Sequence, residues 1–224
     1  LDFKTDEINI KKDIAVIFDQ THYNEEFTPN FIGKILSRVY SNWDQKTYLK
    51  YLTRFKLPMK KKIKKFSRGM KMKLEFAIAF SHNAKLLILD EATSGLDPIV
   101  RDEILSIIRE YTEDEDHTVL MSSHITSDLD KISDYIAYIH EGKLLFMKPY
   151  DELREEYGII HAGKELLDSL NKDDIVGYVE EAYNYTILVK NRSLIQSVFK
   201  DLEMTRPTVE EIMLFHVKGG CERW

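Results

Sequence analysis

The sequence predicts an α/β fold with a parallel sheet, an inserted helical subdomain and a small C-terminal α+β extension. Short apolar segments at residues 14–18, 86–89 and 118–121 are expected strands, and helical patterns follow them. Strands that alternate with helices pair in parallel. The long segment between the first two strands is helical and rich in aromatic residues, and the pattern changes again after Pro149.

These changes in pattern set the expected domain boundaries. Residues 1–20 and 83–149 form the α/β core, residues 21–82 form the helical subdomain, and residues 150–224 form the C-terminal extension. Within the subdomain, apolar residues recur at spacings of three and four until Pro58 interrupts them. The extension mixes acidic helices with a strand at residues 186–189.

Length and composition limit the class of protein. The 224 residues, 43% of them hydrophobic, can bury one core and a small additional lobe. No run approaches the roughly 20 apolar residues of a membrane-spanning helix, so a membrane role is expected to need a partner. The single cysteine, Cys221, and the lack of a signal segment at the start favour a reducing cytoplasm.

The net charge of −6 argues against bulk binding of nucleic acid. One local exception is the basic run at residues 60–65, which reads Lys-Lys-Lys-Ile-Lys-Lys. It is either a binding patch or a solvated linker. Because it lacks the interleaved aromatic residues of a nucleic-acid groove, the solvated linker is favoured.

The core resumes with an apolar strand that ends in Asp90 and Glu91. Asp97 is expected to cap the next helix, with Pro98 at its first position. The inner side of that helix should carry five isoleucine and leucine residues: Ile99, Ile104, Leu105, Ile107 and Ile108. A second buried strand is expected at residues 118–121, then a helix at about 127–132 and a hairpin whose turn is Glu141-Gly142.

The carboxyl ends of parallel strands lie at one edge of a sheet, and ligands of open α/β sheets bind at that edge. Asp90, Glu91 and His124 follow such ends, so they are expected to converge. A carboxylate at the end of an apolar strand favours a cation, and Mg²⁺ is a natural partner for Asp90. Glu91 could polarise a water molecule. Alternatively, the two acids only mark the exit of the strand into solvent.

Three further candidates also have plain structural explanations. Ser67, Arg68 and Gly69 begin a helix whose free amides favour an anion such as phosphate, but they would also suit an ordinary capped helix. His124 could bond a terminal phosphate or act as a surface cap. Gln20 could orient water or coordinate an ion, or be a simple turn residue.

The order of these candidates is more specific than any one of them. The series resembles the ABC ATPase family, whose core is that of P-loop NTPases, from its Q-loop onward and over about residues 14–146. The segments that carry the resemblance, in chain order, are Gln20, Ser67-Arg68-Gly69, Asp90-Glu91, Ser94-Gly95-Leu96-Asp97 and His124.

The resemblance implies ATP and Mg²⁺ as cofactors and a role for each position. Asp90 holds the metal through water, Glu91 is the general base, and His124 is the switch histidine at the γ-phosphate. Gln20 is the Q-loop residue that meets metal and water, and Asp97 belongs to the D-loop that crosses the dimer.

The signature segment is implied to contact the γ-phosphate of an ATP held mainly by the opposite subunit. Ser67 and Gly69 keep the family pattern, whereas Arg68 stands where the family usually has Gly and Met70 where it has Gln. The form Phe-Ser-Arg-Gly-Met, followed by a short C-terminal lobe, is similar to bacterial exporters of antibiotics or antimicrobial peptides.

The resemblance thus implies the ATP-hydrolysing subunit of an ABC transporter. It would act at the cytoplasmic face of the cell membrane, as a head-to-tail dimer with a second ATPase subunit that drives transmembrane permease subunits. The segment 27–29 lies where such proteins receive the permease, and no nucleic acid is involved. Two alternatives are a truncated or non-catalytic domain that only binds a partner, and a soluble ABC ATPase acting on ribosomes or DNA.

No glycine-rich loop ending in Gly-Lys-Ser or Gly-Lys-Thr occurs in the sequence. That loop supplies most of the contacts to the phosphates, and in the family it precedes the Q-loop strand. We therefore expect it to lie before Leu1, or the chain to be unable to hold ATP by itself.

The first prediction is that these 224 residues alone bind ATP only weakly, because the loop and its lysine charge are absent. Calorimetric titration of the chain with ATP, with and without Mg²⁺, measures this directly. Tight, magnesium-dependent binding would contradict the expectation.

Overall fold

The computed structural model describes residues 3–20, 22–182 and 184–218. Contacts divide the chain into two compact units, Leu1–Ile125 and Thr126–Trp224, and each unit is described by itself. Within the described residues, no helix has both the length and the apolar character needed to cross a membrane.

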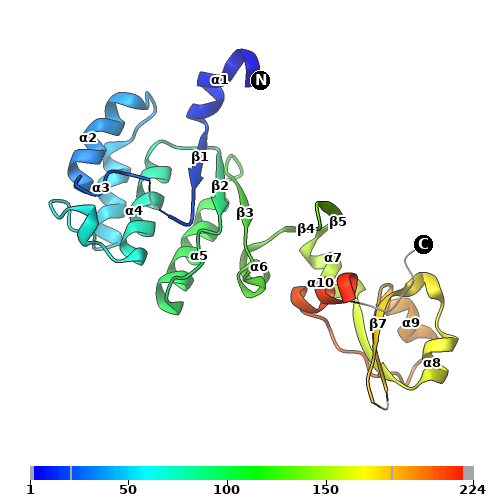
Figure 1. Ribbon diagram of the computed structural model, residues 1–224. Helices are drawn as coiled ribbons and strands as arrows, with labels where there is room; N and C mark the ends of the chain where they lie inside the picture. The colour runs from blue at the N-terminus through cyan, green and yellow to red at the C-terminus, as the bar shows by residue number, and fades with distance from the viewer. Residues whose placement is uncertain (1–2, 21, 183, 219–224) are drawn as a thin grey trace. The chain divides into compact units, whose positions relative to one another are not determined.

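The first unit contains the predicted parallel sheet (Figure 1). Its strands β1 (Ile14–Ile17), β2 (Leu86–Asp90) and β3 (Thr118–Ser122) lie side by side in the order β1-β2-β3. Both pairings are parallel, so the three carboxyl ends reach the same edge. The α/β fold class with a parallel sheet is therefore confirmed.

One face of this sheet is covered by helices. Ala15 and Ile17 of β1 and Leu87 and Leu89 of β2 are buried, and α4 (Arg68–Ser81) contacts β1 while α5 (Pro98–Thr112) contacts β3. The other face is less covered, with Val16 44% and Leu120 61% exposed.

Two burial predictions were wrong. Leu120 of β3 was expected in a buried strand, but β3 is an edge strand of the described sheet and Leu120 is 61% exposed. Ile99 was expected on the inner side of α5, yet it is 80% exposed. It lies in the first turn beside the cap, before the buried stripe of Ile104, Leu105, Ile107 and Ile108 begins.

The helical subdomain contains α2 (Pro29–Val39), α3 (Gln45–Arg54), the 3₁₀ turn η1 (Ile63–Lys65) and α4. Thr28, Asp44 and Ser67 cap α2, α3 and α4 with side-chain oxygens that accept backbone N–H groups. Its core is aromatic, with Tyr48 and Phe76 almost fully buried. The predicted helical insertion is thus present, and α4 carries it back to the sheet.

The second unit begins with α6 (Thr126–Ile132) and the hairpin β4 (Tyr135–His140) and β5 (Lys143–Pro149). Glu141 and Gly142 both have positive φ, as the predicted tight turn requires. The antiparallel sheet β6-β8-β7 follows, from β6 (Gly158–Ala162), β7 (Ile175–Glu180) and β8 (Tyr185–Val189). Four α-helices and a short 3₁₀ turn complete it: α7 (Tyr150–Glu156), α8 (Lys164–Ser169), η2 (Lys172–Asp174), α9 (Arg192–Val198) and α10 (Val209–Lys218).

The hairpin shares its core with the C-terminal elements. Ile136 of β4 and Phe146 of β5 belong to one buried cluster with Leu153, Leu188 and Ile212. The boundary between the two compact units therefore falls after Ile125. The predicted boundary lay after residue 149, with the hairpin in the α/β core.

Gly33 offers a test of the packing between α2 and α3. A Cβ atom there would lie 2.6 Å from Cε1 of Tyr48, whose hydroxyl donates a hydrogen bond to the carbonyl of Pro29 over 2.9 Å. We expect Gly33→Ala to lower the free energy of unfolding by about 1–3 kcal/mol through overpacking. Thermal denaturation followed by circular dichroism measures the loss.

Gly163→Ala is the matched control, because nothing lies within 4 Å of a Cβ atom built there. That variant should unfold at nearly the wild-type temperature. Equal behaviour of the two variants would show that Tyr48 does not press on Gly33.

Candidate functional site

The carboxyl end of β2 brings Asp90 next to the end of β3. The parallel register pairs Asp90 with Ser122, and the Ser122 hydroxyl donates a hydrogen bond to Asp90 Oδ1 over 2.8 Å. One carboxylate oxygen of Asp90 is thereby fixed at the exposed sheet edge. The arrangement orients an acidic side chain without burying its charge.

Glu91 has an unusual backbone conformation for a residue with a side chain. Its φ is 52°, in the left-handed region that costs a non-glycine residue roughly 1 kcal/mol or more. The Glu91 N–H donates to two oxygens of Ser122, the carbonyl at 3.3 Å and the hydroxyl at 3.1 Å. These hydrogen bonds stabilise the turn. Such strain is common at functional sites.

His124 meets the side chain of Glu91. Its Nδ1 lies 2.5 Å from Glu91 Oε2, although the histidine is 66% exposed. The predicted convergence of Asp90, Glu91 and His124 at one edge is therefore confirmed. A carboxylate can only accept, so the ring donates from Nδ1. Nε2 could then donate to a phosphate only when the ring is protonated on both nitrogens.

The N-terminus of α4 carries the serine and glycine of the signature segment. Ser67 Oγ accepts a hydrogen bond from the N–H of Met70 over 3.3 Å, which confirms the predicted cap. Gly69 faces α5, and a Cβ atom there would lie 3.2 Å from Val100. Asp97 caps α5 through the N–H of Val100 over 3.1 Å, so the beginnings of the two helices are neighbours.

Arg68 extends from α4 towards two loops of the α/β core. Its guanidinium donates a hydrogen bond to the carbonyl of Asp19, just after β1, over 3.5 Å. Its Nη1 and Cζ also lie 2.8 and 2.9 Å from the position that a Cβ atom of Gly95 would take. Gly95 has a φ of +65° and lies between Glu91 and Asp97. Arg68 therefore connects the helical subdomain to the loop that follows β1 and to the loop that follows β2.

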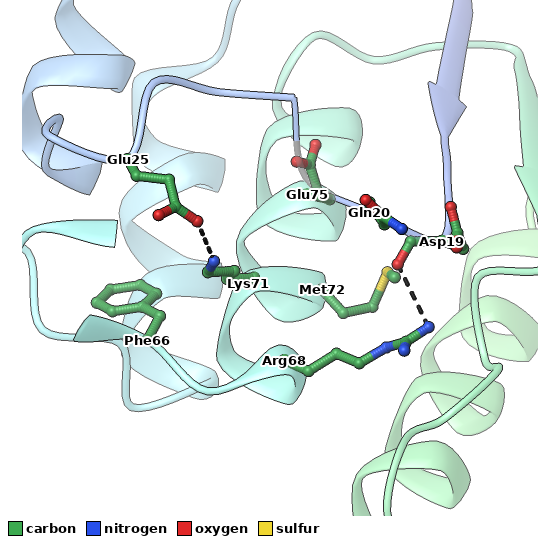
Figure 2. A pocket seen from close by; sticks show the side chains of 8 residues that line it. All are labelled: Asp19, Gln20, Glu25, Phe66, Arg68, Lys71, Met72 and Glu75. Carbon is green, nitrogen blue, oxygen red and sulfur yellow. Dashed lines mark hydrogen bonds and ion pairs between the residues drawn. The ribbon is translucent and has the colours of Figure 1, made fainter. Parts of the chain in front are cut away.

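Gln20 lines a polar cleft of about 300 Å³ on the inner side of α4. Figure 2 shows Arg68 reaching across it towards Asp19, and Lys71 pairing with Glu25. No hydrogen bond or ion pair of the described residues joins Gln20 to Glu91 or His124. The cleft is lined by Asp19, Gln20, Glu25, Phe66, Arg68, Lys71, Met72 and Glu75.

The donors at the sheet edge fit a magnesium ion. No group of three or more metal-binding side chains occurs among the described residues. Mg²⁺ does not require one, because it is usually held by one or two carboxylates together with waters and substrate phosphates. Asp90, with one oxygen fixed by Ser122, supplies the type of ligand that the ion prefers.

Ser122 is the contributor that sequence reasoning missed. Its hydroxyl donates a hydrogen bond to the Asp90 carboxylate and accepts one from the Glu91 N–H. A signal was present, since aligning the two predicted strands in parallel pairs residue 90 with residue 122.

Comparisons with known proteins agree with this geometry. The sequence model described as ABC transporter matches residues 2–94. The ABC transporter ATP-binding protein YtrB of Bacillus subtilis is 24% identical over 226 residues, which are 96% of this chain and 76% of that protein. The lantibiotic transport ATP-binding protein SrtF of Streptococcus pyogenes is 46% identical over 92 residues. That match spans 41% of this chain and only 40% of the relative.

A solved structure described as the ATP-binding subunit of an ABC transporter shares the fold. Its TM-score is 0.61 at 23% identity, covering 69% of this chain and 66% of that chain. At this identity the likeness shows the fold alone.

The contact between Arg68 and Gly95 can be tested by a double-mutant cycle. Gly95→Ala should cost about 1 kcal/mol from its positive φ and an additional amount from the clash with the guanidinium. In an Arg68→Ala background the clash is gone, so the same change should cost less, with a coupling of about 0.5–3 kcal/mol. Denaturant unfolding of the four proteins gives this coupling. Additive costs would mean that Arg68 does not lie over Gly95.

Proposed function

This chain carries an ABC transporter ATP-binding domain, and from this premise we propose that it is the ATP-hydrolysing subunit of a bacterial exporter of peptide antibiotics. The observation that carries the proposal is the contact between Glu91 and His124 beside Asp90 at the sheet edge. The match to a protein named for lantibiotic transport supports the substrate class.

The residues at this edge suit the hydrolysis of a phosphoanhydride bond such as the one that joins the γ-phosphate of ATP. Glu91 accepts a proton from the attacking water, and His124 orients its carboxylate through Nδ1. Asp90, with one oxygen bonded to Ser122, would hold Mg²⁺, which would supply positive charge to the phosphates. When bound, ATP with Mg²⁺ supplies the γ-phosphoryl group for transfer to water. Gln20 senses the permease from the cleft beneath α4.

A second ATPase subunit completes the site in this proposal. Ser67 and Arg68 are exposed at the N-terminus of α4, where free amides and the helix dipole favour a phosphate. Facing the sheet edge of another subunit head-to-tail, this corner contacts the γ-phosphate from the far side. Asp97, at the start of the adjacent α5, lies in the D-loop that crosses between the subunits.

The permease docks on the beginning of α2. Phe27 and Phe31 form an edge-to-face pair with centroids 4.8 Å apart, and Phe31 is 46% exposed. Pro29 starts the helix between them. Exposed aromatic residues on a fixed turn suit an apolar protein contact. In this proposal the subunit lies at the cytoplasmic face of the membrane.

Replacement of Glu91 tests the proposed chemistry in the assembled transporter. Glu91→Gln removes the base but keeps the shape of the side chain, so ATP turnover should fall at least about 100-fold. ATP-dependent dimerisation should persist, as measured by size-exclusion chromatography with light scattering.

Glu115→Gln, at an exposed acid in the loop after α5, is the matched control and should keep full turnover. Hydrolysis at the wild-type rate in Glu91→Gln would show that another residue is the base.

A further inference from the structure

The positive charge of this acidic protein is concentrated in one part of the helical subdomain. Residues 45–74 contain twelve lysine and arginine residues and no aspartate or glutamate, while the whole chain has a net charge of −6. This segment runs from α3 into α4. Such an imbalance within a compact unit indicates an electrostatic function.

Part of this charge is neutralised by acids from neighbouring elements. Glu26 pairs with both Lys62 and Lys64, and their hydrogen bonds lower its pKa to about 2, so it stays ionised at neutral pH. The other pairs are Arg54–Glu110, Lys71–Glu25 and Lys73–Glu103. These contacts leave the loop at residues 56–65 with most of its charge unbalanced.

That loop is solvated, as its sequence favoured, since its lysines are exposed, but it is folded and is not an unstructured linker. Leu57 and Ile63 are buried, between the buried Phe55 and Phe66. The Ile63 N–H donates to the carbonyl of Phe27, and the Lys64 N–H donates to that of Glu25. The entropic cost of ordering the backbone is therefore already met by folding.

Four lysines of this lysine loop, defined as residues 56–65, are exposed: Lys56, Lys60, Lys61 and Lys65. None of them forms an ion pair with another described residue. Met59, among them, is 46% exposed. The loop therefore presents fixed positive charge around one apolar side chain.

Two apolar side chains continue α2 beyond the proposed permease contact at Phe31. Ile35 and Val39 are four residues apart and are 37% and 65% exposed. The N–H of Asn30 donates to the carbonyl of Met59 over 3.1 Å, which joins the start of α2 to the loop. Basic residues beside exposed apolar ones are the composition of surfaces that lie at a membrane interface.

We propose that the lysine loop binds the anionic phospholipid headgroups of the membrane, with Met59 entering the headgroup layer. Lysines act as point charges without the planar fork of arginine, which suits a fluid array of phosphates better than one defined carboxylate. The exposed loop residues include no aromatic side chain on which a nucleic-acid base could stack. The lipid contact lies beside the permease surface at Phe27 and requires no ATP.

The effect can be measured on the 224-residue chain. Each lysine near an anionic surface contributes roughly fivefold to affinity, so replacing Lys56, Lys60, Lys61 and Lys65 with Gln should weaken vesicle binding at least about 100-fold. Co-sedimentation uses phosphatidylcholine vesicles with about a third phosphatidylglycerol, and pure phosphatidylcholine for comparison. Wild-type binding should need the anionic lipid and should fall as salt is raised.

The matched control replaces four exposed lysines of the second unit, Lys143, Lys164, Lys172 and Lys200, with Gln. It changes the net charge by the same amount and should bind within a few-fold of the wild type. Circular dichroism checks that both variants fold. If one of them does not, the salt dependence of vesicle binding by the wild-type chain still tests the proposal.

Three results would overturn the proposal. These are equal binding to neutral and anionic vesicles, equal losses in the two quadruple variants, and tighter binding of a short RNA duplex with the same lysine dependence. These results bear on the lipid contact and not on the proposed ATPase function, because vesicle binding is measured without nucleotide.

Discussion

The parallel register between β2 and β3 is the constraint on which the whole candidate site depends. It pairs Asp90 with Ser122, and the serine then holds both the Asp90 carboxylate and the N–H of Glu91. In the turn after β2, the Glu91 carboxylate contacts Nδ1 of His124. A shift of one residue would move each of these side chains to the other face of the sheet, because side chains alternate along a strand.

The helical insertion is tied to this edge by its last helix. Arg68 spans to the carbonyl of Asp19 and lies over Gly95, while Lys73 of the same helix pairs with Glu103 of α5 over 2.7 Å. These contacts join α4 to the loops after β1 and β2 and to α5. If the proposed permease contact on α2 is correct, this connection would link it to Asp90 and Glu91.

Much of the fold was predictable because local signals agreed with the tertiary structure. The apolar runs gave the three strands, and Ser67, Asp97 and the pair Glu141-Gly142 gave caps and a turn. The features that the sequence did not predict depend on contacts between elements that are distant in the chain. Burial of Leu120 depends on what covers an edge strand, and the fixed conformation of the lysine loop depends on Leu57 and Ile63 entering a core formed by other helices. The direction of Arg68 likewise follows from the approach of two loops, which its sequence neighbours do not encode.

The tautomeric state of His124 tests the central geometry most directly. Long-range ¹H–¹⁵N correlation spectra distinguish the two ring nitrogens, and comparison with His124→Gln assigns the signals. If the strand register places Glu91 against the ring, Nδ1 carries a proton, and this preference is reduced in Glu91→Gln. A neutral ring protonated only at Nε2, with the same spectrum in both proteins, would contradict the convergence of these side chains.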